Sequence, residues 1–324
     1  MSHEKYFEYL ANFMGNNGPI ISISEQPLLP HFEKLHSYRV VLQNKCNEKF
    51  TGLGSDLNIK LAIIKASNEA IGKYALGIAE VSEENNGVAV HEDQNMAREK
   101  SLLELIERDH FMISWLTQTV PYEINIDSLR KQKLFKNLKK LKKNCKSFHV
   151  LGLTFDIPIF VIGVLIVDRN LRVCLGLGTD WNFEGALTKA LIESLRLFGM
   201  SGQWTATQYD KTTQSGNLYW HWTQNKIELL DFLINNNLTD YKDYYNAHNW
   251  IFCFENLLNH LKEKDVQFLK IDAGVFHDRT HVVKSYTSRF QQCFLGIPED
   301  KKVNHQRIEE LGLKWNNHFP HPLN

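Results

Sequence analysis

The alternation of apolar and polar positions divides the chain into predicted strands and helices. Runs of alternating or continuous apolar residues predict strands, and apolar residues at helical spacing predict helices. The predicted strands cover residues 38–43, 147–155, 158–168, 171–178, 266–272 and 281–287. The predicted helices cover residues 59–76, 97–116, 183–199, 225–235 and 245–263. Three consecutive strands with short turns, preceded and followed by helices, predict an α+β or mixed α/β layering and not a strict βαβ alternation.

The longest apolar run, Ile157 to Val167, bears on membrane insertion. It is far shorter than the roughly 20 residues that a spanning helix needs, so it is interpreted as a buried strand. The N-terminal residues lack the basic and apolar regions of a secretory signal. We therefore expect no membrane partner and a cytoplasmic location.

Composition narrows the function classes further. Lys+Arg equals Asp+Glu at 37 each in 324 residues, so no net field attracts nucleic acid or a membrane surface. The five cysteines are odd in number and scattered without a CxxC pair, which argues against a disulfide framework or a thiolate zinc site. Any charged partner must be recognised locally.

One segment is strongly basic. Residues Arg130 to Lys146 contain nine Lys and Arg in seventeen positions, with apolar residues at roughly helical spacing. This pattern predicts an amphipathic basic helix. Two interpretations stay open: a solvated face, or a docking surface for an acidic peptide or partner.

A repeated pattern occurs in three segments, Gly54–Gly77, Gly87–Phe111 and Gly178–Gly199. Each has Gly, a polar turn, two small residues four apart, and Glu three residues later. The nine positions are Ala62, Ala66 and Glu69; Ala97, Ser101 and Glu104; and Ala186, Ala190 and Glu193. These offsets fall on one helix face, so each Glu would point into space left by small residues. A Gly-containing turn opening each helix would expose N–H groups that suit phosphate.

The second segment is the richest, because it adds Glu107 and Arg108 to Glu104 within an apolar helix. Carboxylates that converge between packed helices are costly to bury unless a cation or donors compensate them. A Mg²⁺-nucleotide would do so, because Mg²⁺ is usually shared between carboxylates and phosphates. The alternative is three amphipathic helices with solvated glutamates.

These segments resemble a known family. "SLLELIERDHFMISW" resembles the ExxER helix of YcaO-domain proteins, and "AIIKASNEAIGKY" and "ALTKALIESL" resemble their first and third glutamate helices. "VVKSYTSRFQQC" and the terminal "HFPHPLN" also fit, so the resemblance runs from about residue 50 to the end. It implies a YcaO-like α+β fold with a mixed sheet packed against glutamate-bearing helices. It further implies a lead-in segment over 1–45 and a YcaO-like domain over 46–324 with a functional tail.

The resemblance implies an ATP-dependent cyclodehydratase that phosphorylates a backbone amide oxygen of a precursor peptide. Thiazoline or oxazoline rings would then form from Cys, Ser or Thr. ATP and Mg²⁺ would be the cofactors. The implied metal ligands are Glu69, Glu104, Glu107 and Glu193, and the implied nucleotide-binding set adds Arg108, Arg196 and Ser55.

The C-terminal end is proline-rich, with Pro320 and Pro322 in the last five residues. Such ends are stiff and extended, and lose little entropy on docking. The resemblance implies that Pro320, His321, Pro322 and Asn324 act in cyclisation, His321 as a candidate proton-transfer group. A frayed end is the alternative.

Three departures from the family pattern concern nucleotide contacts. Gly72 and Lys73 stand where the family has Glu and Arg, Arg196 stands where Gln is usual, and Leu53 replaces a frequent Lys. Glycine inside a helix also costs about 1 kcal/mol relative to Ala. Two further hypotheses follow: a thioamide-forming YcaO protein, or a degenerate subunit that scaffolds a modification complex.

The expected partners are a precursor peptide and a separate, adenylating-enzyme-like protein that binds its leader. The latter is expected because, at 324 residues, we expect the chain to lack an additional N-terminal domain that captures a leader peptide. No nucleic acid is expected. A flavin dehydrogenase that oxidises the rings and a homodimer are left open.

Overall fold

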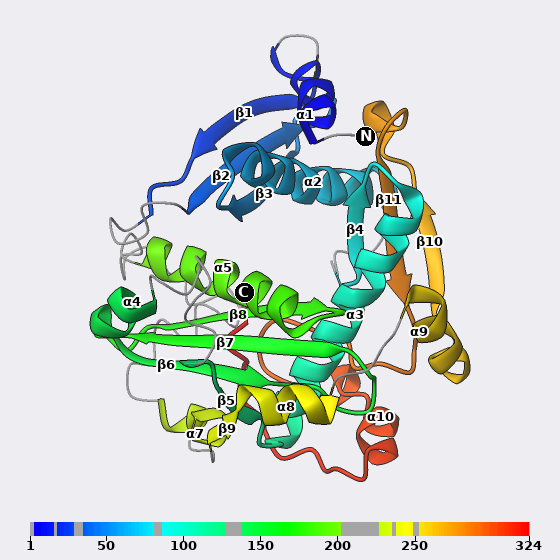
Figure 1. Ribbon diagram of the computed structural model, residues 1–324. Helices are drawn as coiled ribbons and strands as arrows, with labels where there is room; N and C mark the ends of the chain where they lie inside the picture. The colour runs from blue at the N-terminus through cyan, green and yellow to red at the C-terminus, as the bar shows by residue number, and fades with distance from the viewer. Residues whose placement is uncertain are drawn as a thin grey trace. The chain divides into compact units, whose positions relative to one another are not determined.

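The computed structural model describes residues 3–15, 18–28, 35–80, 86–127, 138–201, 227–234, 238–248 and 253–323. The chain forms two compact units (Figure 1). Unit 1 comprises Met1–Leu105 and Val266–Tyr286, and unit 2 comprises Ile106–Asp265 and Thr287–Asn324. The long helix α3 (Gln94–Thr117) begins in unit 1 and ends in unit 2.

The described residues of unit 1 form two antiparallel sheets and α-helices that pack with them. One sheet has the order β1-β2-β3 and the other β10-β11-β4. The strands are β1 (Ile20–Glu25), β2 (His36–Gln43), β3 (Lys49–Asp56), β4 (Val88–His91), β10 (Gln267–Ile271) and β11 (His281–Tyr286). The helices are α1 (His3–Ala11), α2 (Ile59–Ile78) and the first half of α3. Helix α2 packs on β2, β3 and β4, and its apolar side joins the core of this unit.

Unit 2 is built on a five-stranded sheet of order β8-β7-β6-β5-β9. Its strands are β5 (Tyr122–Asn125), β6 (Cys145–Gly152), β7 (Phe160–Asp168), β8 (Val173–Asp180) and β9 (Leu238–Asp240). Its helices are α4 (Leu138–Asn144), α5 (Phe183–Ser201), α7 (Asp231–Ile234), α8 (Tyr241–His248), α9 (Phe254–His260) and α10 (His305–Glu310). All nine residues of β7 are buried, which confirms the predicted buried strand. Helix α5 packs on β7 and β8.

The two units share a local architecture. In each, an antiparallel hairpin leads into a long helix that packs on it: β2–β3–α2 in unit 1 and β7–β8–α5 in unit 2 (Figure 1). Corresponding residues lie 124 positions apart, because β3 begins at Lys49 and β8 at Val173. The strand register repeats as well, since Val40 pairs with Gly52 and Val164 pairs with Gly176. The repeat therefore extends beyond the helices in which the sequence pattern was found.

The predicted fold class is confirmed, and each predicted strand is present within a few residues of its expected bounds. The basic segment differs: its helix α4 ends at Asn144, because Cys145 already belongs to β6, and residues 130–137 lie outside the described part. The single helix predicted over 245–263 is instead divided between α8 and α9. Cys253, with extended backbone, starts α9 afresh.

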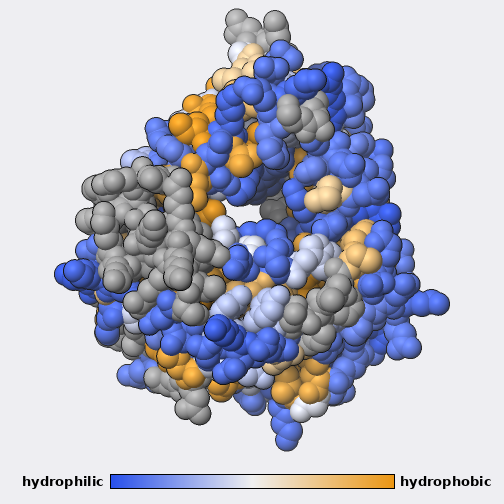
Figure 2. Space-filling model, viewed as in Figure 1, coloured by the Kyte–Doolittle hydropathy of each residue, from blue (hydrophilic) through white to orange (hydrophobic). Residues whose placement is uncertain are grey.

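No helix among the described residues is long and apolar enough to cross a membrane. The face shown in Figure 2 is mostly hydrophilic, with hydrophobic atoms exposed over the β1–β3 sheet of unit 1. Ile21 of β1 is one of the exposed apolar side chains in that sheet.

Candidate functional site

In unit 1, close contact between β3 and α2 positions Glu69. A Cβ atom at Gly54 would lie 2.2 Å from the backbone nitrogen of Ala66, so only glycine allows this approach. Asn58 caps α2 by accepting the Leu61 N–H. One turn beyond the close contact, the Glu69 Oε2 atom accepts the Leu53 N–H at 3.0 Å. The carboxylate is thus fixed to the strand that it faces.

Unit 2 repeats this arrangement around Glu193. A Cβ atom at Gly178 would lie 2.2 Å from the Ala186 carbonyl oxygen. Asn182 accepts the Gly185 N–H at 2.7 Å, and Glu193 Oε2 accepts the Leu177 N–H at 2.8 Å. The same backbone group therefore anchors the same carboxylate oxygen in both units.

These contacts correct one prediction. Gly54 and Gly178 were placed in turns that open helices, but both lie inside strands, β3 and β8. The small helix residues leave room for strand backbone, and not for a ligand. Ser55, assigned to nucleotide binding, is buried and donates its hydroxyl to Ser37 Oγ at 3.0 Å.

Helix α3 carries the third glutamate segment in a different setting. Ser101 is buried and its Oγ atom contacts Ser285 Oγ of β11 at 2.6 Å, within unit 1. Glu104, Glu107 and Arg108 follow at helical spacings of three and four, which places them on one side of α3. Glu104 belongs to unit 1, and Glu107 and Arg108 belong to unit 2.

Glu107 has a strongly perturbed carboxyl group. Loss of surrounding water raises the pKa of Glu107 to about 7; the charge of Glu193 acts in the same direction and that of Arg108 opposes it. The buried Thr179 hydroxyl lies beside Glu107 and acts to lower the pKa of that carboxyl, although its Oγ1 atom makes no hydrogen bond of full geometry within the described residues. Unit 2 thus brings together two carboxylates that repel each other and a buried hydroxyl oxygen.

A buried ionic cluster lies next in sequence to the ExxER residues, and sequence reasoning missed it. The Arg307 guanidinium of α10 donates to both carboxylate oxygens of Asp109 and of Asp156. Burial opposes the charge of Arg307, but its hydrogen bonds to both carboxylates keep its pKa above the ordinary value. Arg307 and Asp109 are fully buried, so this cluster fixes α3 against α10. Asp109 stands within the quoted "SLLELIERDHF", but nothing in its spacing points to a partner 198 residues away.

The C-terminal tail packs within unit 2 up to Leu323, and Asn324 lies outside the described residues. Trp115 Nε1 of α3 donates to the Phe319 carbonyl at 2.8 Å, and Pro320 and Pro322 are buried. Leu323 forms a parallel β-bridge with Leu175 of β8. Leu175 is two residues from Leu177, whose N–H anchors Glu193, so the tail ends beside this strand.

His321 is buried, and both of its ring nitrogens make contacts. Its Nδ1 atom accepts the Leu323 N–H at 3.2 Å, and Nε2 faces the Phe294 carbonyl, which assigns the proton to Nε2. Burial lowers the pKa of His321 to about 4, so the ring is neutral at pH 7. In this arrangement the His321 ring holds the tail in place through its contacts with Leu323 and Phe294. Its predicted proton-transfer role would require these bonds to open.

The structure shows what surrounds the residues that depart from the family pattern. A Cβ atom at Gly72 would lie 3.3 Å from Val90 Cγ2, so this position faces the packed strand β4. Arg196 approaches Glu193 only to 4.0 Å. Leu53 contributes its N–H group to Glu69, which any residue except proline could do.

A protein-family model matches this chain. The family model described as YcaO cyclodehydratase, ATP- and Mg²⁺-binding, matches residues 75–287, more than half of the chain. The chain belongs to the YcaO family. The predicted family is confirmed, and the predicted cofactors, ATP and Mg²⁺, are those of the family. Glu69 and the tail lie outside the matched range. No curated protein matches this YcaO chain.

Two solved structures share the YcaO fold. A YcaO protein from Methanopyrus kandleri, bound with AMPPCP and Mg²⁺, is 13% identical with a TM-score of 0.70. The alignment covers 94% of this chain and 96% of that one. A heterocyclase in complex with substrate and cofactor is 12% identical with a TM-score of 0.69. That alignment covers 89% of this chain and 52% of that one. At these identities the likeness shows the fold alone.

The residues of unit 2 fit a Mg²⁺-nucleotide. Mg²⁺ prefers oxygen ligands and is usually held by one or two carboxylates together with substrate phosphates. Glu107, Glu193 and the buried Thr179 hydroxyl supply such oxygens. Among the described residues, no group of three or more acidic, His or Cys side chains is placed to hold a metal ion.

Proposed function

We propose that this YcaO protein is the ATP-dependent cyclodehydratase subunit of a peptide-modifying complex, forming thiazoline or oxazoline from Cys, Ser or Thr of a precursor peptide. In this reaction the side chain attacks the preceding carbonyl carbon, and the former amide oxygen leaves as phosphate. Bound Mg²⁺–ATP would supply the phosphoryl group that makes this oxygen a leaving group.

The chain's own residues have separate roles in the proposal. Glu107 and Glu193 would hold the cation in unit 2. The predicted ligand set also names Glu69 and Glu104 of unit 1, and Glu69 is already paired with Lys73. Arg108 and Arg196 would pair with phosphate, for which a planar guanidinium is suited. The tail, Pro320 to Asn324, would act on the peptide during cyclisation.

The observation that carries the azoline assignment is the Leu323–Leu175 bridge. It supports an active tail, because it places the end of a proline-rich segment beside the strand that anchors Glu193. A frayed end would make no such contact. This contact gives no support to the alternative that the chain forms thioamides.

A second candidate, a scaffold subunit without catalysis, is favoured by one contact. Glu69 pairs with Lys73 at 2.6 Å, so one predicted metal ligand is already neutralised. The precursor peptide and a separate leader-binding protein are expected partners in either case. A flavin dehydrogenase would add a later oxidation.

Binding of AMPPCP with and without Mg²⁺ separates the enzyme from the scaffold. We expect Mg²⁺-dependent binding by calorimetry, and the enzyme proposal fails if none occurs at millimolar nucleotide. The chain is then co-expressed with a Cys/Ser/Thr-rich peptide encoded by a neighbouring gene, and the mass of the modified peptide distinguishes the possible products. An azoline loses one water per ring, whereas a thioamide gains mass because sulfur replaces oxygen.

Truncation of Pro320 to Asn324 tests the tail. We expect the truncated chain to retain AMPPCP binding and to lose ring formation in the co-expression experiment. Unchanged ring formation would show that the Leu323 bridge is only structural.

A further inference from the structure

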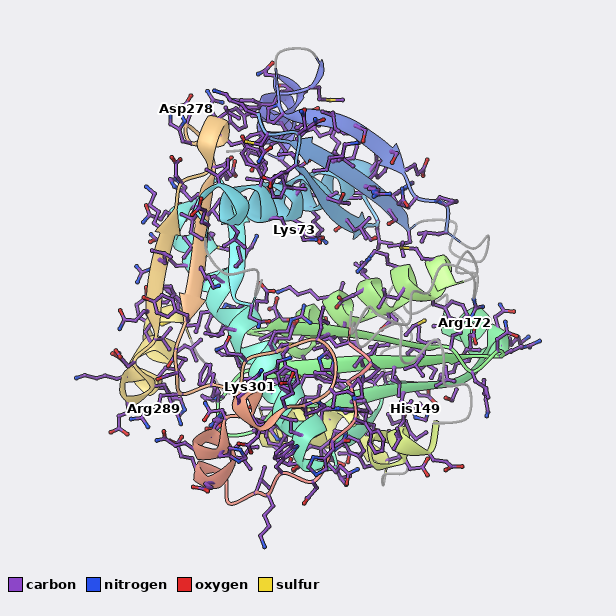
Figure 3. All side chains as sticks on the ribbon, turned by 180° about the vertical axis from the view of Figure 1, so that it is seen from behind. Lys73, His149, Arg172, Asp278, Arg289 and Lys301 are labelled. Carbon is purple, nitrogen blue, oxygen red and sulfur yellow. The ribbon has the colours of Figure 1, made fainter. Side chains whose placement is uncertain are left out.

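Lys73 occupies an unusual position on α2 (Figure 3). Its ammonium group lies 2.6 Å from Glu69 Oε1 and donates to the Thr51 carbonyl of β3 at 2.9 Å. Glu69 Oε2 meanwhile accepts the Leu53 N–H. Both carboxylate oxygens are therefore engaged, and the ammonium bridges helix and strand.

The repeat in unit 2 shows the same carboxylate without this cation. The position 124 residues after Lys73 is Leu197, which is buried against the core. Within the described residues, the ion pair of Glu193 Oε1 is with Arg196, and its 4.0 Å separation is beyond hydrogen-bond distance. Glu193 Oε1 is thus available to an added cation, whereas Glu69 Oε1 is paired.

A Glu–Lys pair four residues apart is common on helix surfaces. Two features set this pair apart. Lys73 has a second acceptor on β3, and Glu69 is tied to the same strand through Leu53. The ion pair is thus held by backbone groups on both sides, and one of the three ammonium donors is left for another oxygen, such as that of a phosphate.

We infer that Lys73 is a built-in counter-ion that takes the place of a divalent cation on Glu69. A divalent ion at Glu69 Oε1 would have to displace the ammonium and would be repelled by it. The positive charge in unit 1 is then supplied by a side chain, and divalent ions are held by unit 2. This inference rests on the proposed Mg²⁺-nucleotide binding for its biological meaning, but its test does not.

Counting bound Mn²⁺ by electron paramagnetic resonance tests the inference directly. Mn²⁺ replaces Mg²⁺, and each variant of the full chain is titrated alone and with AMPPCP. Lys73→Leu introduces the residue found at the matched position of α5, and Lys73→Gln removes the charge with less change in polarity. Lys73→Arg keeps the charge. Lys65→Leu is the matched control, because Lys65 also pairs with a carboxylate, Asp56, and donates to a β3 carbonyl.

We expect Lys73→Leu and Lys73→Gln to bind one Mn²⁺ per chain more than the wild type. Lys73→Arg and Lys65→Leu should match the wild-type count. The inference is overturned if folded Lys73→Leu and Lys73→Gln gain no Mn²⁺ in either titration, or if Lys65→Leu gains as much. Circular dichroism establishes that each variant is folded.

The two titrations separate this inference from the proposed function. If the wild type binds no Mn²⁺ with AMPPCP, the proposed function fails, and the titration without nucleotide still decides the role of Lys73. If the wild type binds Mn²⁺–AMPPCP and the Lys73 variants gain none, only the counter-ion inference fails.

Discussion

The strand–helix repeats of the two units have the same backbone arrangement. They differ in the side chains that follow the anchored glutamate. Gly54 and Gly178 allow the same close approach, and Glu69 and Glu193 accept the same strand N–H bond. The residues that follow each glutamate differ. They are Gly72 and Lys73 in α2, and Arg196 and Leu197 in α5.

This contrast separates what the backbone requires from what the ligand requires. A position whose Cβ would overlap the helix backbone has no alternative to glycine, so both units keep it. The positions three and four residues beyond the glutamate face other groups and can vary. Their variation leaves the Glu69 side chain, 41% exposed, paired with a lysine. The Glu193 side chain is 22% exposed, and no lysine among the described residues is paired with it.

The largest effect is expected from disrupting the close contact between strand and helix. Gly178→Ala or Gly54→Ala would place a methyl group about 2.2 Å from helix backbone, which cannot move without shifting α5 or α2. We expect each substitution to lower the free energy of unfolding by about 3 kcal/mol or more. This is the upper end of the usual cost of overpacking. Urea denaturation measures this loss.

Gly163→Ala is the control for this pair of variants. Gly163 is also a strand glycine, but its Cβ would meet only side-chain atoms, the nearest 3.3 Å away in Leu153. A much smaller loss is expected. Equal losses at all three positions would mean that the close strand–helix approach is not what selects glycine.

The next effect compares the two anchored carboxylates. Glu193→Gln keeps an acceptor for the Leu177 N–H and removes the charge. We expect it to weaken Mg²⁺–AMPPCP binding by about tenfold or more, equivalent to about 1.4 kcal/mol. Glu69→Gln should change the affinity by less than roughly threefold, about 0.7 kcal/mol, because Lys73 already neutralises Glu69. Calorimetry measures both.

Glu184→Gln serves as the control for charge removal from α5. Glu184 lies in the first turn of α5 and is exposed, so binding should stay at the wild-type level. If Glu69→Gln weakened binding as much as Glu193→Gln, the two carboxylates would be equivalent ligands. The contrast drawn here between the two units would then be wrong.

A pH titration sharpens the description of unit 2. Because the pKa of Glu107 is raised to about 7, its carboxyl must lose a proton before it can bind a cation. Mg²⁺ affinity should therefore rise as the pH increases through about 7 and then level off. The stability of the ligand-free chain changes in the opposite sense. It falls as pH rises from the unfolded pKa near 4.5 through about 7, because the unfolded chain ionises first.

Glu107→Gln provides the comparison for both pH profiles. The amide does not titrate, so the rise in Mg²⁺ affinity and the fall in stability near pH 7 should both flatten. Calorimetry and urea denaturation at a series of pH values measure the two profiles. Unchanged profiles in the variant would assign the titration to another group.

Sequence patterns were sufficient for elements whose burial is continuous or periodic. Strand β7 is apolar throughout, and α2, α3 and α5 have regular apolar spacing, so each was predicted near its observed bounds. Strand β3 was missed. Its sequence, KFTGLGSD, has the glycines of a turn, and their cause is contact with a helix that follows in the chain.

The candidate site was predictable only in part, for a related reason. Helical spacing was the basis for predicting Glu69 and Glu193 as ligands, because their positions relative to small residues repeat along the chain. It did not give their strand partners, the Lys73–Thr51 contact or the cluster of Asp109 with Arg307. Those partners are separated by 16, 22 and 198 residues. Contacts over such distances depend on tertiary packing, which local patterns do not encode.

The smallest effect is expected at Gly72, where the two repeats differ in helix propensity. Gly72→Ala should stabilise α2 by up to about 1 kcal/mol, less the cost of a 3.3 Å contact with Val90 Cγ2. Urea denaturation measures this small gain. Because the added methyl group would face β4, Mg²⁺–AMPPCP binding should stay unchanged. A loss of binding in a stabilised variant would instead place position 72 next to the ligand, and the repeats would then differ in a nucleotide contact as well as in packing.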